Sequence, residues 1–362
     1  AEGLFWLKVH VANCCGYDKH DNKLKEKWTD DNWEQIQDFI NNPLDVDSPE
    51  PDTAFTLLQA GLALQEALSM DEPTEYICHV SIAMDATCSG LQHLSALTRD
   101  PVGAYYTNLI DNGKDQKSDI YMRVAEVADV SKTELIGDKP VVQAFWKDLN
   151  ITRNMAKNPV MTFVYGSTLI STLDTLALNM SEMGIEPIKD EQGKILFSLN
   201  ALATPVGKAL RKGVQDTVPE SALMIKYLQT VVRKHKDVCM QWLNPVGVPV
   251  VNWAEGHTTK RLAIRSMGVS AITFTQRDNI YNTRAASNGI VPNFVHSHDA
   301  GHLCLTILDF NGQCLPIHDS FATHPSDVGE LHKSLRRTFI KMYQDYDLTD
   351  NLLIPNEIDL EE

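Results

Sequence analysis

The sequence has 362 residues, of which 43% are hydrophobic and 22% are charged, and its formal net charge is −16. This length suits about two domains with a sizeable core. The chain has no run near the roughly 18 to 20 uninterrupted apolar residues of a membrane-spanning helix, and its first residues lack the basic and apolar regions of a secretion signal.

The charge is unevenly distributed along the chain. Residues 345–362 carry seven Asp or Glu and no Lys or Arg, whereas residues 151–290 carry 16 Lys or Arg against 10 Asp or Glu, a local excess of +6. An acidic chain disfavours a nucleic-acid partner because phosphate binding needs local positive charge, but a basic middle permits one. Three basic clusters in that middle are equally explained as solvated helix faces; they are Lys208/Arg211/Lys212, Arg233/Lys234/Lys236 and Lys260/Arg261/Arg265. The seven cysteines form no CxxC pair, which indicates reduced thiols.

The first part of the chain predicts a loop, a helix and a strand. Residues 41–52 have the composition of an acidic surface loop, and residues 53–70 predict an amphipathic helix with Asp52 as its N-cap. Residues 76–84 (YICHVSIAM) are a β-type run that ends at Asp85. The small and polar residues after Asp85 predict a turn into a helix over residues 91–99.

The second part predicts further helices and two hairpins. We expect helices over residues 150–165 and 215–240, and another that Pro292 opens and that ends near residue 308. Turn residues between apolar β-formers over residues 242–251 predict a hairpin. The runs 313–317 and 321–323 flank His318, Asp319 and Ser320, which predicts a short hairpin with an aspartate near its turn.

Two aspartates follow apolar β-runs, Asp85 after VSIAM and Asp319 after CLPIH. Taken singly, Asp85 is explained as a helix N-cap and Asp319 as a turn residue. Taken together, they suggest two strands that present two carboxylates to a pair of Mg²⁺ ions, which proteins usually hold with one or two carboxylates, substrate phosphates and water. In a two-metal site, one ion activates the attacking 3′-hydroxyl and the other stabilises the leaving pyrophosphate.

The segment 153–166 (RNMAKNPVMTFVYG) places four side chains at intervals of four residues. On a helix these positions drift slowly around one face, which would carry two cations, a thioether and an aromatic ring before Gly166. Such a face suits a nucleoside triphosphate, with the cations at the phosphates. The alternative is an ordinary amphipathic helix with two exposed cations, and Pro159 is awkward in either case because it removes a helical hydrogen bond.

The segment 294–302 (FVHSHDAGH) also permits a metal site. His298 and His302 lie four residues apart, and together with His296 and Asp299 they resemble parts of metallohydrolase motifs. The alternative is a set of polar and core histidines on one helix. The rest of the sequence offers no further ligand cluster with zinc spacing, which weakens the hydrolase hypothesis.

Four segments in this order resemble the phage-type single-subunit RNA polymerases, a family that includes the mitochondrial RNA polymerases and has the family-A DNA polymerases as distant relatives. The segments are DATCSGLQHLSALTRD (85–100), RNMAKNPVMTFVYGS (153–167), PNFVHSHD (292–299) and IHDSF (317–321). The resemblance extends from residue 4 to about residue 346. Tyr165 and Ser320 favour the RNA polymerases over the DNA polymerases.

The resemblance implies a role for each matching residue. Asp85 and Asp319, the latter in the HDS motif with His318, correspond to the metal-binding catalytic aspartates, and the backbone carbonyl of Ala86 stands where relatives contact the metal through a glycine. The other matching residues correspond to the nucleotide site. Arg153 and Lys157 match the cations on the triphosphate, with Lys157 also as general acid, and Met161, Tyr165 and Gly166 belong to the same fingers segment. Tyr165 matches the aromatic residue that gates template and nucleotide and helps to select ribose over deoxyribose, His296 matches the histidine near the ribose 2′-hydroxyl, and Tyr121 matches a nucleotide-site tyrosine.

The sequence departs from the family at several positions. Asn158 and Pro159 differ from the usual fingers helix, which questions its geometry after Lys157. Residues 244–271 correspond to the region that leads into and forms the promoter-reading hairpin, where only Arg261 is a recognisable polar match. The other base-reading positions fall near Ala263, Ala271 and Thr273, which cannot make bidentate base contacts. We therefore expect weak or absent autonomous promoter recognition.

The fold that the resemblance implies is a helix-rich α+β right-hand polymerase. Its palm has a small antiparallel sheet, its fingers are helical, and its N-terminal domain and part of its thumb are absent from this chain. The expected divisions are a first palm part (1–110), the fingers (111–285) with the nucleotide helix at 150–166 and a specificity-loop-like region at 244–275, a second palm part (286–346) and an acidic tail (347–362).

The implied function is DNA-directed RNA synthesis from ribonucleoside triphosphates with two Mg²⁺ ions. Because the family's N-terminal part is absent, either the chain is a fragment or a second polypeptide supplies the template-gripping surface. We expect the second polypeptide, together with an accessory factor for promoter engagement. The cytoplasm of an infected host cell is the expected location if a phage encodes the chain. The alternatives are the metal-dependent hydrolase and an inactive polymerase-like nucleic-acid scaffold.

Overall fold

The computed structural model describes residues 1–17, 21–111, 117–137, 140–147, 149–236, 238–264 and 270–358. The chain divides into two compact units. Unit 1 comprises residues 1–86, 111–117 and 300–345, and unit 2 comprises residues 87–110, 118–299 and 346–362. Helices dominate both units and all the sheets are small and antiparallel, which confirms the predicted helix-rich α+β class.

Unit 1 begins with four helices that share one hydrophobic core: α1 (Glu2–Cys14), α2 (Asn22–Asp31), α3 (Trp33–Asn41) and α4 (Ala54–Ser69). Short 3₁₀ turns precede and follow α4, η1 (Pro51–Thr53) and η2 (Pro73–Glu75). Leu7, Phe39 and Leu64 meet in the core. The helix predicted over residues 53–70 is confirmed, but Asp52 is not its cap: Thr53 occupies the N-cap position and makes no side-chain cap hydrogen bond.

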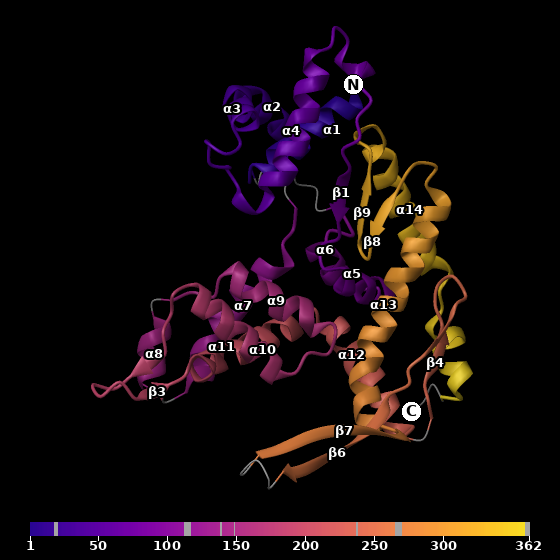
Figure 1. The fold of residues 1–362 in the computed structure, drawn as a ribbon. Coiled ribbons are helices and arrows are strands. Elements are labelled where there is room, and N and C mark those ends of the chain that lie inside the picture. The colour runs from indigo at the N-terminus through magenta and orange to yellow at the C-terminus, as the bar shows by residue number, and fades with distance from the viewer. Residues whose placement is uncertain are drawn as a thin grey trace. The chain divides into compact units, whose positions relative to one another are not determined.

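A three-stranded antiparallel sheet lies at the centre of unit 1, in the order β1-β9-β8 (Figure 1). The strands are β1 (Ile82–Asp85), β8 (Leu315–Ile317) and β9 (Ser320–Thr323). The predicted hairpin is confirmed, whereas only the last part of the β-run at 76–84 is a strand. The reason is that β9 offers four residues for pairing, from Ser320 opposite Asp85 to Thr323 opposite Ile82.

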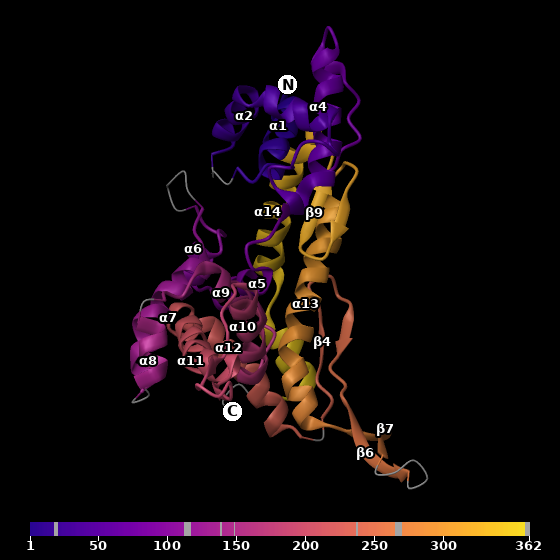
Figure 2. The same cartoon turned by 60° about the vertical axis from the view of Figure 1, so that its left-hand side comes forward.

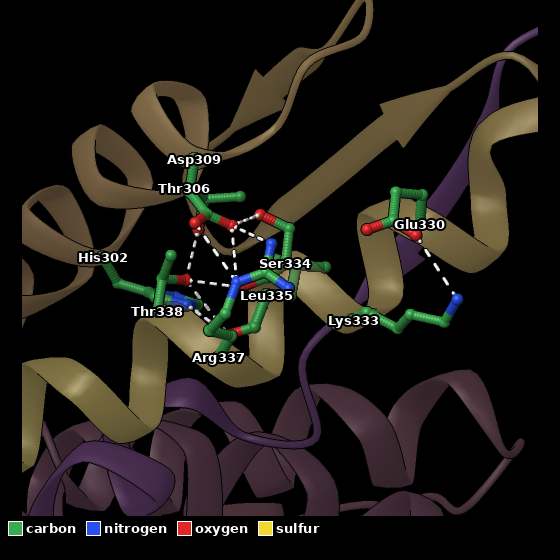
Figure 3. Close-up of polar contacts among 9 residues, drawn as sticks. All are labelled: His302, Thr306, Asp309, Glu330, Lys333, Ser334, Leu335, Arg337 and Thr338. Carbon is green, nitrogen blue, oxygen red and sulfur yellow. Dashed lines mark hydrogen bonds and ion pairs between the residues drawn. The ribbon is translucent and has the colours of Figure 1, made fainter.

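Two long helices complete unit 1. Helix α13 (Thr283–Asp309) starts in unit 2 and ends in unit 1, and helix α14 (Val328–Asp345) follows the 3₁₀ turn η4 (Pro325–Asp327). Figure 3 shows how the end of α13 is bonded to α14: Asp309 accepts hydrogen bonds from Arg337 and Ser334, and Thr306 bonds to Thr338. The prediction that Pro292 opens a helix is wrong. Asn282 accepts a bond from the Ala285 N–H, so the helix begins there and Pro292 lies inside it.

The helices of unit 2 surround the larger core (Figure 2). They are α5 (Ser89–Thr98), α6 (Pro101–Tyr106), α7 (Ile120–Ile136), α8 (Pro140–Lys147), α9 (Arg153–Phe163), α10 (Leu169–Glu182), α11 (Leu199–Thr217) and α12 (Pro219–Lys234). The single helix expected over 215–240 is therefore wrong. Val218 leaves the helical region, with a φ of −131° and a ψ of 67°, because proline disfavours helical geometry in the residue before it, and Pro219 starts α12.

Three two-stranded sheets also belong to unit 2: β2 (Ile188–Lys189) with β3 (Ile195–Phe197), β4 (Gln241–Leu243) with β5 (Pro249–Val251), and β6 (Glu255–Ile264) with β7 (Ser270–Tyr281). The hairpin predicted over residues 242–251 is confirmed by the β4–β5 pair. A π-helix, η5 (Thr349–Leu353), and a 3₁₀ turn, η6 (Ile354–Asn356), follow α14 and attach to β4, where Asn356 bonds to the backbone of Gln241. Of the predicted acidic tail, residues 359–362 lie outside the described residues.

Candidate active site

The two aspartates predicted to bind metal lie at adjacent strand ends in unit 1. Asp85 is the last residue of β1 and pairs with Ser320, the first residue of β9, and Asp319 immediately precedes Ser320. The side chain of Asp85 is exposed and that of Asp319 is half-buried. The pairing of β1 with β9 therefore brings the backbones of Asp85 and Asp319 close together, although the two residues are 234 positions apart in the sequence (319 − 85).

His318 and Asp319 form the two-residue turn between β8 and β9. The pairing of Ile317 with Ser320 closes the turn, and His318 adopts a left-handed φ of 57°. A non-glycine residue seldom adopts this conformation, although histidine tolerates it better than branched residues do. The tight turn fixes the backbone on which the Asp319 carboxylate stands.

The donor set at these strand ends fits Mg²⁺. It comprises the Asp85 and Asp319 carboxylates and the backbone carbonyl of Ala86, all of them hard oxygen ligands. Over the described residues, no group of three or more His, Cys, Asp or Glu side chains is arranged to hold a metal ion. Magnesium does not require such a cage, because waters and substrate phosphates complete its coordination.

Helix α9 in unit 2 presents the predicted cations on its solvent side. Met155, Val160 and Phe163 are buried, whereas Lys157 and Met161 are exposed. Thr152 caps the helix by accepting a bond from the Met155 N–H, and the helix continues through Pro159 to Phe163. The departure at Pro159 therefore leaves the helix intact, but Tyr165 lies two residues beyond its end.

Asp119 contacts the predicted site residue Arg153, a pairing that the sequence did not reveal. Its carboxylate pairs with Arg153, with 2.5 Å between Oδ2 and Nε, and also accepts bonds from the N–H groups of Tyr121 and Met122 at the start of α7. The Arg153 guanidinium in turn lies over the ring of Tyr121, 5.3 Å from its centroid. Burial, followed by the nearby Cys88 thiol, raises the pKa of the Tyr121 hydroxyl well above its usual value, so the phenol stays protonated. An Asp directly before a helical segment was the available signal.

Tyr165 and His296 contact each other in unit 2. Their ring centres are 4.8 Å apart and the planes are inclined by 35°. Gly166 follows with a left-handed φ of 73°, which glycine adopts without strain. The next carbonyl, that of Ser167, accepts a 2.7 Å bond from Arg211, whose guanidinium lies over Phe163. Arg211 therefore does not belong to a merely solvated face, and it helps to hold the turn that carries Tyr165.

The histidine cluster that suggested a hydrolase does not form one site. His296 contacts Tyr165, and the Nδ1 of His298 bonds to the carbonyl of Phe294 in the core. Asp299 bonds to His93, and His302 bonds to the carbonyl of Leu335 (Figure 3). The four side chains are engaged with separate partners, and this geometry contradicts the metallohydrolase alternative.

Hairpin β6–β7 carries the residues that correspond to promoter-reading positions. Arg261 pairs with Thr273 and Ala263 pairs with Ala271, so these four positions lie on one face of the ribbon. The opposite face holds Leu262 and Ile272, which are paired and more than half exposed. Arg265 and residues 266–269 lie outside the described residues.

Unit 1 has a cavity of about 530 Å³ between α1, residues 73–79 and η4, and none of the predicted site residues lines it. None of the helices in the described part of the chain is both long enough and apolar enough to cross a membrane.

Comparison with known proteins gives consistent relatives. The family model for DNA-dependent RNA polymerase matches residues 1–358. The DNA-directed RNA polymerase of Pseudomonas phage phiKMV is 32% identical over 355 residues, which cover 94% of this chain and 42% of the phage protein. T7 RNA polymerase of Escherichia phage T7 is 28% identical, and the match covers 96% of this chain and 44% of the T7 protein. The mitochondrial DNA-directed RNA polymerase of Homo sapiens is 29% identical, and the match covers 96% of this chain and 28% of the human protein. The chain spans less than half the length of these curated relatives.

Proposed function

Because this chain belongs to the family of DNA-dependent RNA polymerases, we propose that it joins ribonucleotides in the order set by a DNA template, as the catalytic part of a phage-type RNA polymerase. One observation carries the proposal: the register that pairs Asp85 with Ser320 brings the two aspartates to adjacent strand ends. If a phage encodes the chain, the expected setting is the cytoplasm of an infected host cell.

In this proposal, the carboxylates of Asp85 and Asp319 and the carbonyl of Ala86 hold two Mg²⁺ ions. When bound, such ions stabilise charge on the attacking and leaving oxygens. The turn at His318 orients one ligand and strand β1 orients the other. These positions are fixed by the backbone before substrate arrives, so little reorganisation is needed in the reaction.

In this proposal, residues of unit 2 bind the incoming nucleotide. Arg153 and Lys157 hold its triphosphate, and Lys157 donates a proton to the departing pyrophosphate. Met161, Gly166 and Tyr121 line the nucleotide site, and Tyr165 with His296 selects ribose over deoxyribose. Arg153 already binds one carboxylate, that of Asp119, and in this proposal the triphosphate takes up the guanidinium N–H groups that this ion pair leaves available.

Partners are the remaining part of the proposal. The net charge of −16 supports a second polypeptide that provides basic surface for the template, and the loss of base-reading side chains beside Arg261 supports an accessory factor for promoters. RNA synthesis measured on single-stranded and duplex templates, with and without candidate partner chains, tests this. Full activity and promoter choice by the chain alone would refute the requirement.

The substitution Asp319→Asn tests the catalytic assignment. We expect incorporation to fall by about a thousandfold or more, because metal-mediated stabilisation of several kcal/mol corresponds to about three powers of ten in rate. The matched control is Asp71→Asn, which removes an exposed carboxylate of the same unit and should leave the rate unchanged. Retained incorporation by folded Asp319→Asn polymerase would sink the assignment.

A further inference from the structure

A buried carboxylate joins helices α5 and α13 inside unit 2, and the proposed reaction does not use it. Asp299 Oδ1 lies 2.8 Å from Nε2 of His93, and their side chains are 13% and 4% exposed. The buried side chain of Ser89 also bonds to Asp299. Burial alone would raise the pKa of Asp299, but the hydrogen bond with His93 and the electrostatic interactions with His93 and His296 hold this pKa below its usual value. The carboxylate is therefore ionised and firmly bonded.

Consecutive residues of α13 at this level point to different partners, as the 100° step of an α-helix requires. His296 meets Tyr165, Ser297 accepts a 3.0 Å bond from the indole N–H of Trp242, and Asp299 meets His93. Two polar anchors on separate sides thus fix the rotation of α13 about its own axis. That rotation decides where the His296 ring lies.

We propose that the buried His93–Asp299 pair is a positioning element of the nucleotide site, which holds His296 against Tyr165 and thereby sets the selection of ribose over deoxyribose. This inference rests on the proposed polymerase function, in which those two rings contact the sugar. Without the pair, the remaining anchors of this part of α13 are Asn293, which bonds to Asn252, and Ser297, whose hydroxyl accepts from Trp242 and whose carbonyl accepts from Asn244. The His296 ring then has more freedom, and loss of position at a reacting site is costly.

The test compares ribonucleotide with deoxyribonucleotide incorporation by the polymerase that contains this chain. Asp299→Asn keeps the shape of the side chain and removes its charge. We expect the ratio of kcat/KM for the two substrates to fall by about tenfold or more, mainly through a higher KM for the ribonucleotide. A merely structural role would reduce the amount of folded enzyme and lower both rates equally, so the ratio would not change.

Two further variants sharpen this test. His93→Gln retains an N–H donor toward Asp299 and should preserve most of the selectivity, whereas His93→Leu should lose it. The matched control is Asp309→Asn. This change removes the carboxylate that pairs with Arg337 at the other end of α13, in unit 1, and it should leave the ratio unchanged. If His93→Leu fails to fold, Asp299→Asn alone decides. An unaltered ratio in Asp299→Asn overturns the proposal.

A second measurement does not need activity. In protein labelled with ¹³C on histidine and tyrosine, the nuclear Overhauser contact between the His296 and Tyr165 rings, assigned with His296→Gln, should weaken in Asp299→Asn and persist in Asp309→Asn. An unchanged contact in Asp299→Asn would also overturn the positioning role. A wild-type protein that incorporates no nucleotide refutes the polymerase function instead, and the spectra still report on the pair.

Discussion

Two antiparallel hairpins of this protein have opposite constructions. The β8–β9 hairpin has three paired positions closed by a two-residue turn, and β9 has a second partner in β1. The β6–β7 ribbon has nine paired positions and pairs with no third strand among the described residues. Three of the four residues of β9 are buried, whereas the described side chains along most of the long ribbon are exposed.

The difference shows that the fold constrains the backbone around Asp319 more tightly than the backbone of the β6–β7 ribbon. Around Asp319, the position of the backbone is fixed by two strands, a strained turn and the Phe310–Phe321–Leu331 core. Along the ribbon, cross-strand pairs fix only the internal geometry, as in any two-stranded ribbon. The proposed metal binding at Asp319 would need the first arrangement, because metal coordination requires closely fixed ligand positions.

The largest expected difference between the hairpins concerns their phenylalanines. Phe321 of β9 is 3% exposed and Phe274 of β7 is 43% exposed. We expect Phe321→Ala to lower the free energy of unfolding by about 3–5 kcal/mol, because it leaves a cavity in a closed core. Phe274→Ala should lower it by less than about 1 kcal/mol. Urea unfolding measures both, and equal losses would abolish the distinction.

The next effect concerns the turn itself. Because His318 has a left-handed φ, a β-branched side chain there should be strained, and we expect His318→Val to cost about 1–2 kcal/mol. His318→Gly should leave stability unchanged within about 1 kcal/mol, since glycine adopts this φ freely but adds entropy to the unfolded chain. Thr275→Val on the exposed ribbon is the matched control and should be near neutral. Thermal unfolding compares them, and a harmless His318→Val would show that the turn is not strained.

The smallest expected effect appears on acidification. Hydrogen bonds from Arg337 and then Ser334 lower the pKa of Asp309 below the usual 3.8. The clamp on α14, which carries Leu331 of the core beneath β9, thus contributes fully above the ordinary carboxyl pKa. Its contribution is lost as the pH falls from about 3.8 through the lowered pKa of the folded state. Thermal unfolding between pH 6 and pH 2.5 should show a shallower acid loss for Asp309→Asn than for wild type; identical pH profiles would contradict the clamp.

The sequence predicted those features whose signals are local. The apolar runs around His318 and Asp319 gave the hairpin, and the four-residue spacing from Arg153 gave α9. Two predicted helix boundaries were wrong because the effect of a proline depends on its position in the helix. Pro219 begins a new helix within a stretch that was expected to be one continuous helix, whereas Pro292, which was expected to begin a helix, lies inside α13.

Other features depend on partners that the sequence does not connect. Asp119 and Arg153 are 34 residues apart, and His93 and Asp299 are 206 residues apart. A single sequence shows such groups as isolated polar residues. For that reason the histidines of 294–302 suggested a shared metal, although each has its own partner in the fold. Tyr165 with His296 was expected at one site only through the family resemblance.

The long ribbon also bears on the colloidal behaviour of the protein. Both outer edges of β6 and β7 have backbone N–H and C=O groups without a neighbouring strand in the described part of the chain, and such edges can recruit strands from other molecules. Lys260, Arg277 and Asp278 place charges along the ribbon and oppose this stacking. These charges therefore keep the exposed strand edges of neighbouring molecules apart at high protein concentration.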